Sequence, residues 1–438
     1  MTRSLFGTDG VRGEAGTFLS AELATALGRA TTASLEAERP QVLIVRDTRE
    51  SGPMLEAALA AGIAAAGGDA LLAGVLPTPA AAILVQRLGL DLTAVVSASH
   101  NPFHDNGIKF FDGNGVKLAD EVEARIEALI EEPPPAERAG RVRELNGGLD
   151  DYLRELQAAF PLDLSGCKVL LDCANGATHR AAPAIFERLG AEVEAIGVEP
   201  DGRNINAGCG STHVEALAER VVASEAEIGF AFDGDGDRVL AADGDGRVHD
   251  GDELIALAAR GMAGRGELNG GVVVTVMSNY GFHQAMTEAG IEVAVTQVGD
   301  RYVIDEMRKR SWPLGGEQSG HIICSDFVST GDGIAAALTT MRELGGRRLE
   351  DAVPMEKLPQ TLVNVQVANR EAVKDAAVVW EAVERENEGL EGRGRVLLRP
   401  SGTEPLVRVM VEAPTAEEAE STAERLAGLV RQELAEKS

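Results

Sequence analysis

The chain has 438 residues, of which 44% are apolar and 25% are charged, and its formal net charge is −29. This length suggests about three globular domains, and the composition excludes an intrinsically disordered chain, a coiled coil and a collagen. A surface this acidic repels nucleic acids and anionic membranes. Any phosphate must therefore be bound by a local group of arginines, lysines and backbone N–H groups.

The cysteines and the N-terminus indicate the compartment. No Cys-x-x-Cys pair occurs among the four cysteines, which are Cys167, Cys173, Cys209 and Cys324. The usual zinc motifs are thereby excluded, and reduced thiols are expected. The N-terminus lacks a signal-peptide core, and no apolar run approaches the roughly eighteen residues of a membrane span. We expect a cytoplasmic monomer or homodimer with neither nucleic-acid nor membrane partners.

Short apolar strands alternate with helices in the first hundred residues. Strands are expected at Gln41–Val45, Ala70–Val75 and Leu92–Val96, with helices at Met54–Ala66 and Pro79–Leu88 between them. This βαβαβ order predicts a mostly parallel sheet that is covered by helices. The strands are almost entirely apolar, as strands buried on both faces should be.

The same order then recurs twice, after a break at Pro133–Pro135. The second run has strands at Cys167–Leu171 and Ile228–Phe232 around a helix at Arg180–Leu189. The third run has strands at Val272–Val276 and Val293–Thr296 around a helix at His283–Ala289. We therefore expect three domains of similar α/β topology.

The C-terminal part has a different pattern. Its expected strands are Thr361–Val367, Val396–Leu398 and Leu406–Val411. Its expected helices are Glu371–Arg385 and Ala416–Leu434. The last helix is amphipathic, and Thr415 is placed to cap its N-terminus. These elements predict a separate α+β unit.

Three carboxylates follow the strand Ile228–Phe232, as Asp233, Asp235 and Asp237, and Arg238 comes directly after them. In open α/β sheets ligands bind at the carboxyl ends of strands. Close carboxylates repel one another unless a cation lies between them, and oxygen ligands suit Mg²⁺. We expect a magnesium site here, and only a hairpin turn at the similar sequence Asp243–Gly246.

A serine loop follows the strand Leu92–Val96, with the sequence Ser97-Ala-Ser99-His-Asn-Pro. Ser99 is placed to act as a nucleophile, although it has no Gly-x-Ser-x-Gly context of the hydrolase type. Lys109 lies close by in the sequence and could stabilise phosphate charge or transfer a proton.

Two further loops carry polar groups suited to a phosphorylated sugar. Two arginines flank the first loop, which contains the candidate phosphate-binding residues Arg399, Ser401, Gly402, Thr403 and Arg408. The second, Gly315–His321, contains Glu317, Ser319 and His321, a set of donors and acceptors suited to sugar hydroxyls. No P-loop and no Gly-x-Gly-x-x-Gly sequence follows a strand, which argues against a nucleotide substrate. Together the four loops indicate phosphoryl transfer on a phosphosugar.

These four loops, in this order, resemble those of the α-D-phosphohexomutase superfamily over nearly the whole chain. The sequences Phe6–Gly13, Asn204–His213 and Val298–Val303, with Gln318 in the sugar loop, resemble the bacterial branch that acts on glucosamine phosphates. The resemblance implies four domains around a central cleft, three α/β and one C-terminal α+β. We expect them at residues 1–150, 151–252, 253–360 and 361–438, carrying the serine, metal, sugar and phosphate loops respectively.

The resemblance also implies an isomerase mechanism. Ser99 would rest as phosphoserine, and its phosphate would join the three aspartates in holding one Mg²⁺. The phosphoserine would phosphorylate glucosamine 6-phosphate to a 1,6-bisphosphate. This bisphosphate would turn round and return its original phosphate to Ser99, which leaves glucosamine 1-phosphate. The product would serve the synthesis of amino-sugar nucleotides and peptidoglycan precursors. The candidates for charge stabilisation or proton transfer are Arg12, Lys109, Arg238 and His321, and the general base stays open.

Three alternatives remain. A mutase of mannose or glucose phosphates would use the same scaffold. A catalytically silent phosphosugar-binding protein would bind without turnover. A serine-dependent phosphatase would release inorganic phosphate, because water could intercept the phosphoserine.

Overall fold

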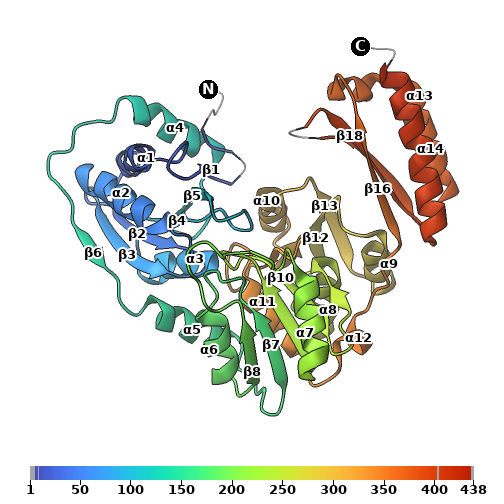
Figure 1. Ribbon diagram of the computed structural model, residues 1–438, viewed down its shortest axis with the longest axis horizontal. Helices are drawn as coiled ribbons and strands as arrows, with labels where there is room; N and C mark the ends of the chain where they lie inside the picture. The colour runs from blue at the N-terminus through green and yellow to red at the C-terminus, as the bar shows by residue number, and fades with distance from the viewer. Residues whose placement is uncertain (1–4, 8, 402–403, 436–438) are drawn as a thin grey trace. The chain divides into compact units, whose positions relative to one another are not determined.

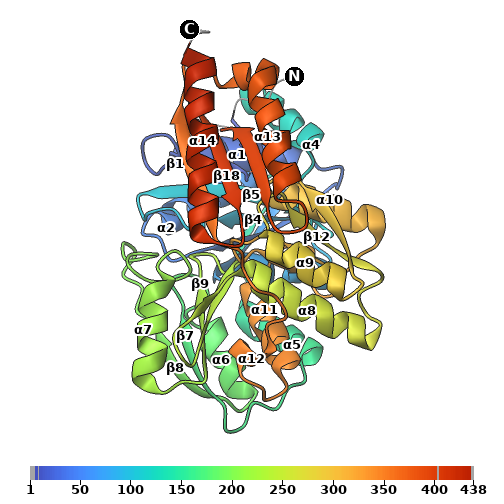
Figure 2. The same cartoon turned by 90° about the vertical axis from the view of Figure 1, so that its right-hand side faces the viewer.

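The computed structural model describes residues 5–7, 9–401 and 404–435 of the chain. Internal contacts divide the chain into two compact units. The first comprises residues up to 277 together with 291–353, and the second comprises residues 278–290 together with those from 354 onward. Figures 1 and 2 show the elements of each unit.

The first sheet of unit 1 has six strands, in the order β1-β5-β4-β2-β3-β6. Its strands are β1 Val11–Glu14, β2 Gln41–Arg46, β3 Asp69–Val75, β4 Leu92–Val96, β5 Asp105–Asp112 and β6 Val142–Glu144. Its helices are α1 Ala21–Ala33, α2 Gly52–Ala65, α3 Thr78–Arg87 and α4 Asp120–Glu131. The strands from β4 to β6 run parallel, whereas β5 and β1 add an antiparallel edge.

The second sheet repeats this plan, in the order β11-β10-β9-β7-β8. Its strands are β7 Lys168–Asp172, β8 Glu192–Ile196, β9 Ile228–Phe232, β10 Val239–Asp243 and β11 Val248–His249. Its helices are α5 Gly148–Ala159, α6 Ala181–Arg188 and α7 Val214–Ser224. The three strands β9, β7 and β8 are parallel, and β10 and β11 extend them in antiparallel fashion.

The third sheet has the order β13-β12-β14-β15, of which the first three strands are parallel. Its strands are β12 Gly271–Thr275, β13 Glu292–Thr296, β14 Leu314–Gly316 and β15 Ile322–Cys324. The helices of this part of unit 1 are α8 Gly251–Arg265, α10 Asp300–Arg310, α11 Gly333–Leu344 and α12 Leu349–Ala352. Three mixed α/β sheets of similar topology are therefore present, as predicted.

The serine, metal and sugar loops follow equivalent strands in these three sheets. In each sheet the chain moves from a central strand to one neighbour and then crosses back to the other side, reaching β4, β9 and β14. Right-handed crossovers place the helices of such a reversal on opposite faces, so that a crevice opens at the carboxyl ends of the strands. This common position explains why three loops so far apart in sequence can supply one site.

Burial of the central strands explains their apolar sequences. Val42–Val45 in β2 and all of β12 are buried, and β9 is buried along its length. Because helices cover both faces, no alternation of polar and apolar residues is needed. The ten predicted strands are all present with ends within about two residues of the prediction. Uniform hydrophobicity made the buried ones recognisable, whereas Thr361–Val367 also contains Asn364 and Gln366.

Unit 2 contains an antiparallel sheet in the order β16-β18-β17. Its elements are α9 Tyr280–Glu288, β16 Gln360–Gln366, the 3₁₀ helix η1 Arg370–Asp375, α13 Ala377–Gly389, β17 Arg395–Pro400, β18 Leu406–Glu412 and α14 Ala416–Ala435. Thr415 caps α14 as predicted, since its Oγ1 accepts the Glu418 N–H at 3.2 Å. A C-terminal α+β sheet unit is thus confirmed.

One predicted helix, Glu371–Arg385, is wrong in extent. The structure has η1 and α13 instead, with a break at Ala376. Val373 and Val379 are both buried in the core of this unit. In one continuous helix, residues six apart would point about 120° away from each other, so the break lets both valines face the same core.

Two smaller expectations concern turns and membranes. The Asp243–Gly246 sequence forms the predicted hairpin turn between β10 and β11, with the Asp243 N–H bonded to the Arg247 carbonyl at 3.0 Å. Among the described residues, no helix combines the length and hydrophobicity needed to cross a bilayer. The domain boundaries expected from the sequence stay a prediction.

Candidate active site

Ser99 lies at the carboxyl end of β4 and is buried. Its hydroxyl donates a 2.5 Å hydrogen bond to Asp233 Oδ2 and lies 3.2 Å from the ring Nδ1 of His100. Asp233 belongs to the second sheet, so this contact joins two α/β domains. The predicted nucleophile and the first predicted metal ligand are therefore in direct contact.

The loop after β9 brings its three carboxylates together. One oxygen from each of Asp233, Asp235 and Asp237 lies within 4.8 Å of the others, and all three residues are buried. Gly234 allows the approach to the serine loop, because a Cβ there would lie 2.5 Å from the Ser99 carbonyl oxygen. Alternating glycines thus let one short turn direct three carboxylates to a single point.

The charge of this cluster is only partly balanced by protein groups. Burial raises the pKa of Asp233 well above its usual range, and the neighbouring carboxylates Asp237 and Asp235 raise it further. Asp235 Oδ1 and Asp237 Oδ1 are buried without any hydrogen-bond partner. Unpaired carboxylate oxygens that converge in this way suit a hard divalent cation with oxygen ligands.

Lys109 is the closest cation to the three carboxylates. It lies on β5 beside β4, and its Nζ is 2.6 Å from Asp235 Oδ2 and 3.8 Å from Asp237 Oδ2. Burial alone would lower its pKa, but Asp235, Asp9 and Asp237 outweigh burial and raise the pKa above its usual value. The sequence placed Lys109 near Ser99 along the chain, and the structure shows its ion pair with Asp235.

Six side chains of alternating charge form a ring beside this cluster: Asp237, His321, Asp300, Lys117, Asp9 and Lys109. Lys117 pairs with Asp9 and with Asp300, the latter at 2.5 Å. The ring draws on all three α/β domains, so it binds their carboxyl-end loops together. Asp9 and Asp300 were noted only within segments that carry a resemblance, and Lys117 was not predicted, because an acid or a lysine in a loop has no local signal.

His321 is buried between two carboxylates of this ring. Its Nδ1 lies 3.7 Å from Asp237 Oδ2, and its Nε2 lies 3.8 Å from Asp300 Oδ2 and 3.1 Å from the Gly331 N–H. Burial would lower the pKa of the imidazole, but Asp237 and Asp300 raise it above its usual value. Nδ1 therefore faces Asp237 of the metal loop, whereas Nε2 accepts the Gly331 N–H and faces Asp300.

The two remaining cationic candidates lie at the edge of the cluster. Arg238 donates its backbone N–H to Asp233 Oδ1 at 3.2 Å, and its guanidinium Nε lies 3.8 Å from Asp237 Oδ1. Arg12 pairs with Asp9 from strand β1. The side chains of Arg12 and Arg238 are each about a quarter exposed, which leaves them able to contact a ligand.

The predicted sugar loop is the tight turn between β14 and β15. Glu317 donates its N–H to the His321 carbonyl and accepts, through Oε1, the N–H of Gly299 at 2.9 Å. Ser319 is exposed at the tip of the turn. The turn thus fixes Glu317 beside the start of α10 and leaves the serine hydroxyl accessible.

The predicted phosphate loop connects β17 to β18 in unit 2. Arg399 and Arg408 are directly opposite each other on the two strands. Burial lowers the pKa of Arg399, and the neighbouring Arg408 lowers it further. Ser401 is buried, and its Oγ accepts the Glu404 N–H at 3.3 Å. Two facing guanidiniums favour a bound anion; Gly402 and Thr403 lie outside the described residues.

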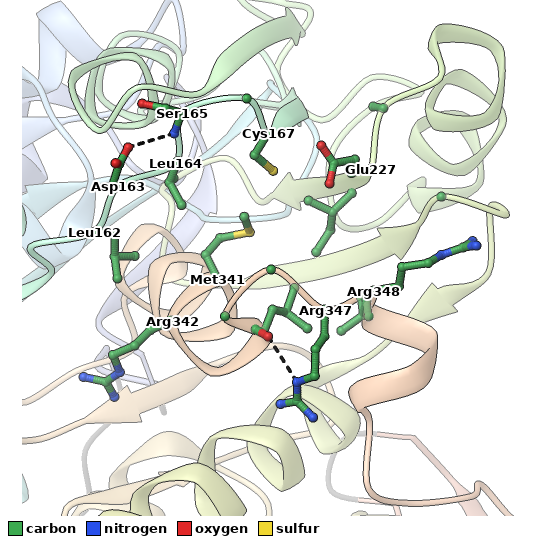
Figure 3. Close-up of a pocket in the computed structure, with 18 of the residues that line it drawn as sticks. Leu162, Asp163, Leu164, Ser165, Cys167, Glu227, Met341, Arg342, Arg347 and Arg348 are labelled. Atoms are coloured by element: carbon green, nitrogen blue, oxygen red, sulfur yellow. Dashed lines mark hydrogen bonds between the residues drawn. The ribbon is translucent and has the colours of Figure 1, made fainter.

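A cavity of about 730 Å³ occurs elsewhere in unit 1, and Figure 3 shows its lining. It lies where Leu162–Cys167 and Glu225–Ile228 meet the segment Met341–Leu349. None of the residues predicted for the site lines it. Some polar side chains of its lining already have hydrogen-bond partners, since Arg347 donates to the Glu343 carbonyl at 2.8 Å. The cavity therefore takes no part in the site described above.

Comparison with known proteins gives a consistent result over the whole chain. Models of the phosphoglucomutase/phosphomannomutase domains I, II and III match residues 3–136, 150–246 and 250–358, and the model of the C-terminal domain matches 362–429. A phosphoglucosamine mutase of Pelotomaculum thermopropionicum is 51% identical, with 98% of this chain and 99% of that protein covered. One from a Nocardioides species is 50% identical, covering 99% and 100%.

Solved structures agree on the fold. A phosphoglucomutase/phosphomannomutase family protein of Burkholderia thailandensis superimposes with a TM-score of 0.83 and 25% identity, covering 98% of this chain and 97% of that one. An N-acetylphosphoglucosamine mutase of Aspergillus fumigatus, solved with GlcNAc-6P and magnesium, gives a TM-score of 0.68 at 20% identity, covering 99% and 96%.

Proposed function

Because the chain belongs to the phosphoglucomutase/phosphomannomutase family, we propose that it is a phosphoglucosamine mutase, an isomerase that interconverts glucosamine 6-phosphate and glucosamine 1-phosphate. The identity of about half of all residues with relatives of that name supports the choice of sugar. We further propose that the protein is cytoplasmic and is a monomer or a homodimer. Its product would serve cell-wall precursor synthesis.

The observation that carries the proposal is the contact of Ser99 Oγ with Asp233 inside a buried group of carboxylates and cations. In the forward direction, phosphoserine 99 transfers its phosphoryl group to the O1 hydroxyl of glucosamine 6-phosphate. The serine O–P bond breaks, a sugar O–P bond forms, and the hydroxyl proton ends on the serine oxygen. After the 1,6-bisphosphate has turned round, Ser99 takes the phosphoryl group from O6 and leaves glucosamine 1-phosphate.

The three aspartates and the Ser99 phosphate would hold one Mg²⁺. The unpartnered oxygens of Asp235 and Asp237 fit such an ion, because each has a lone pair and no protein donor. When bound, the ion neutralises charge on the phosphoryl oxygens during transfer. Lys109, hydrogen-bonded to Asp235, and Arg238, close to Asp237, would add fixed positive charge beside the carboxylates.

Binding of the sugar phosphate is assigned to two loops. Arg399, Ser401, Gly402, Thr403 and Arg408 would hold the phosphate that does not react, and Glu317, Ser319 and His321 would hold the sugar hydroxyls. Two opposed arginines support the first assignment, since forked guanidiniums match phosphate oxygens. Arg12 and His321 complete the candidates for charge stabilisation or proton transfer, and the general base is left unassigned.

A ³¹P NMR time course tests the proposal. The protein is mixed with Mg²⁺, glucosamine 6-phosphate and a trace of glucosamine 1,6-bisphosphate, in parallel with mannose and glucose 6-phosphates. We expect glucosamine 1-phosphate to form fastest, without inorganic phosphate. Faster conversion of mannose or glucose phosphate would overturn the choice of sugar, release of inorganic phosphate would indicate a phosphatase, and binding without turnover would indicate a phosphosugar-binding protein.

A further inference from the structure

Arg49 is the largest fully buried side chain among the described residues. It follows β2, the central strand next to β4, in the sequence Arg46-Asp-Thr-Arg49. A buried charge is unfavourable unless it is paired and hydrogen-bonded. Arg49 takes no part in the proposed phosphoryl transfer, so its burial at the edge of the site needs a reason.

All five N–H donors of this guanidinium are used. Its Nε donates to Asp47 Oδ2 at 2.8 Å, and its Nη2 donates to the carbonyls of Ser99 and Asn101, each at 2.8 Å. Nη1 donates to the carbonyls of Pro102 and Asp105, the latter at 2.9 Å. Four of the five acceptors are backbone oxygens of residues 99–105, so Arg49 holds almost the whole loop that carries the nucleophile.

A second chain of contacts starts from the same carboxylate. Asp47 Oδ2 also accepts the Ser97 hydroxyl at 2.6 Å, and Ser97 Oγ in turn accepts the Ser99 N–H at 2.9 Å. The N–H and the carbonyl of Ser99 are therefore both held by the Asp47–Arg49 pair, one through Ser97 and the other directly. The backbone of Ser99 has no freedom to rotate without breaking one of these bonds.

This restraint matters because Ser99 has an unusual backbone conformation. Its φ is +51°, in the left-handed region that residues other than glycine seldom adopt. A residue in such a conformation persists only where its surroundings hold it there. The second domain contributes to this as well, since Asn206 Nδ2 donates to the Ser99 carbonyl at 2.9 Å. The conformation points Oγ toward Asp233 at 2.5 Å.

We propose that Arg49 is a positioning residue for phosphoryl transfer, which holds the Ser99 backbone in the conformation that presents Oγ to the carboxylate loop. The proposal rests on the proposed function, because it assumes that Ser99 accepts and donates phosphate. Arg49 touches no reacting atom. Arginine is required because lysine has three donors on one nitrogen and cannot reach acceptors spread around a planar fork.

The test is Arg49→Lys, which keeps the charge and removes the fork. Transfer from glucosamine 1,6-bisphosphate forms the Ser99 Oγ–P bond, breaks a sugar O–P bond and moves the serine proton to the sugar oxygen. We expect kcat to fall about tenfold to a hundredfold with KM within about twofold, since displacement of a reacting atom by about 1 Å has effects of this size. The rate of Ser99 phosphorylation, followed by intact-protein mass, should fall by the same factor.

Arg46→Lys is the matched control. Arg46 is the last residue of β2, is half-buried and pairs with Glu56 at 3.1 Å. It also donates to the Asp47 backbone carbonyl at 3.2 Å, but among the described residues it makes no hydrogen bond or ion pair with the serine loop or with the Asp47 carboxylate. The same substitution there should leave kcat and the phosphorylation rate within about twofold, the scatter expected for a change that moves no reacting atom. Thermal unfolding of each variant shows how much folded protein contributes to the measured rate.

Ser97→Ala covers the case in which Arg49→Lys does not fold. It removes the acceptor of the Ser99 N–H, and we expect kcat to fall about tenfold at unchanged KM. Wild-type kcat in Arg49→Lys, or in Ser97→Ala if Arg49→Lys is unfolded, would overturn the proposal, as would an equal loss in Arg46→Lys.

The two proposals fail in distinguishable ways. A wild-type protein that takes phosphate onto Ser99 but does not convert glucosamine phosphates overturns the proposed function, and the phosphorylation rate still tests Arg49. A wild-type protein that takes up no phosphate overturns both.

Discussion

The serine loop of unit 1 and the Arg399–Arg408 hairpin of unit 2 hold their polar groups in different ways. Ser99 is fixed through its N–H, its carbonyl and its hydroxyl, each by a different residue. Arg399 has no hydrogen-bond or ion-pair partner among the described residues and faces the like charge of Arg408, which pairs only at an exposed position with Glu404 at 3.2 Å. A group that must react needs a fixed geometry, whereas a group that binds an anion is best left with donors to offer.

This difference predicts two kinetic classes. Changes around the serine and metal loops should lower kcat, and changes in the hairpin should raise KM.

Ser99→Ala should remove turnover while the protein stays folded. We expect kcat to fall by more than about a thousandfold, because the substitution removes the hydroxyl that carries the phosphoryl group. The ³¹P NMR assay measures kcat, and thermal unfolding checks the fold. Substantial residual interconversion would mean that the phosphoryl group is carried elsewhere.

Asp237→Asn should weaken the metal site. We expect the Mg²⁺ concentration needed for half-maximal activity to rise by about ten- to a hundredfold, because one of three charged ligands is lost. A Mg²⁺ titration of activity measures it. Asp245→Asn is the control, since Asp245 lies in the similar Asp-Gly-Asp-Gly sequence of the β10–β11 turn and pairs at the surface with Arg348. An equal effect of both substitutions would argue against a metal site at Asp237.

Arg399→Lys and Arg408→Lys should show the opposite kinetic signature. We expect KM for glucosamine 6-phosphate to rise about tenfold with kcat nearly unchanged, because a lysine loses the forked contact with phosphate but keeps its charge. Initial rates over a range of substrate concentrations separate the two constants. Arg393→Lys, at an exposed position before β17, is the control. A fall in kcat at constant KM would place these arginines with the reacting groups instead.

The smallest expected effect is on stability, and it comes from the buried histidine His249, which lies outside both loops. His249 is buried between Asp243 at 2.9 Å and Glu253 at 3.0 Å. Burial would lower its pKa, but hydrogen bonds with Glu253 and Asp243 raise the pKa above its usual value. The folded state therefore binds the proton more tightly than the unfolded state. The resulting stability is fully present below the unfolded pKa of about 6.5 and is lost as the pH rises through the folded pKa.

His249→Gln tests this sign. At pH 6 we expect the substitution to lower the free energy of unfolding by about 1–3 kcal/mol, the value of charge-assisted hydrogen bonds, and the difference should shrink as the pH rises. Urea unfolding at several pH values measures it. Since His249 lies in neither loop, kcat and KM should stay at wild-type values, and a loss of either would weaken the division into two kinetic classes.

Local patterns in the sequence were enough to locate most elements. Strands such as Val42–Val45 are uniformly apolar because both faces are covered, and glycine-rich or hydroxyl-rich turns follow them directly. The serine and metal loops could be predicted for the same reason, since each is a short continuous segment at a strand end. The helix expected at Glu371–Arg385 failed because packing of Val373 and Val379 into one core outweighed helical periodicity.

The sequence by itself determined the strand order along the chain, the residue types at each strand end and the kind of chemistry they suit. Only the tertiary structure decided which distant groups meet: Asp9 with Lys117 and Asp300, and Arg49 with the carbonyls of the serine loop. Backbone carbonyls carry no sequence signal, and a charged residue is equally at home in solvent. Such contacts exist only once segments far apart in the sequence are brought to one place, and those of Arg49 supply the restraint that a reacting hydroxyl requires.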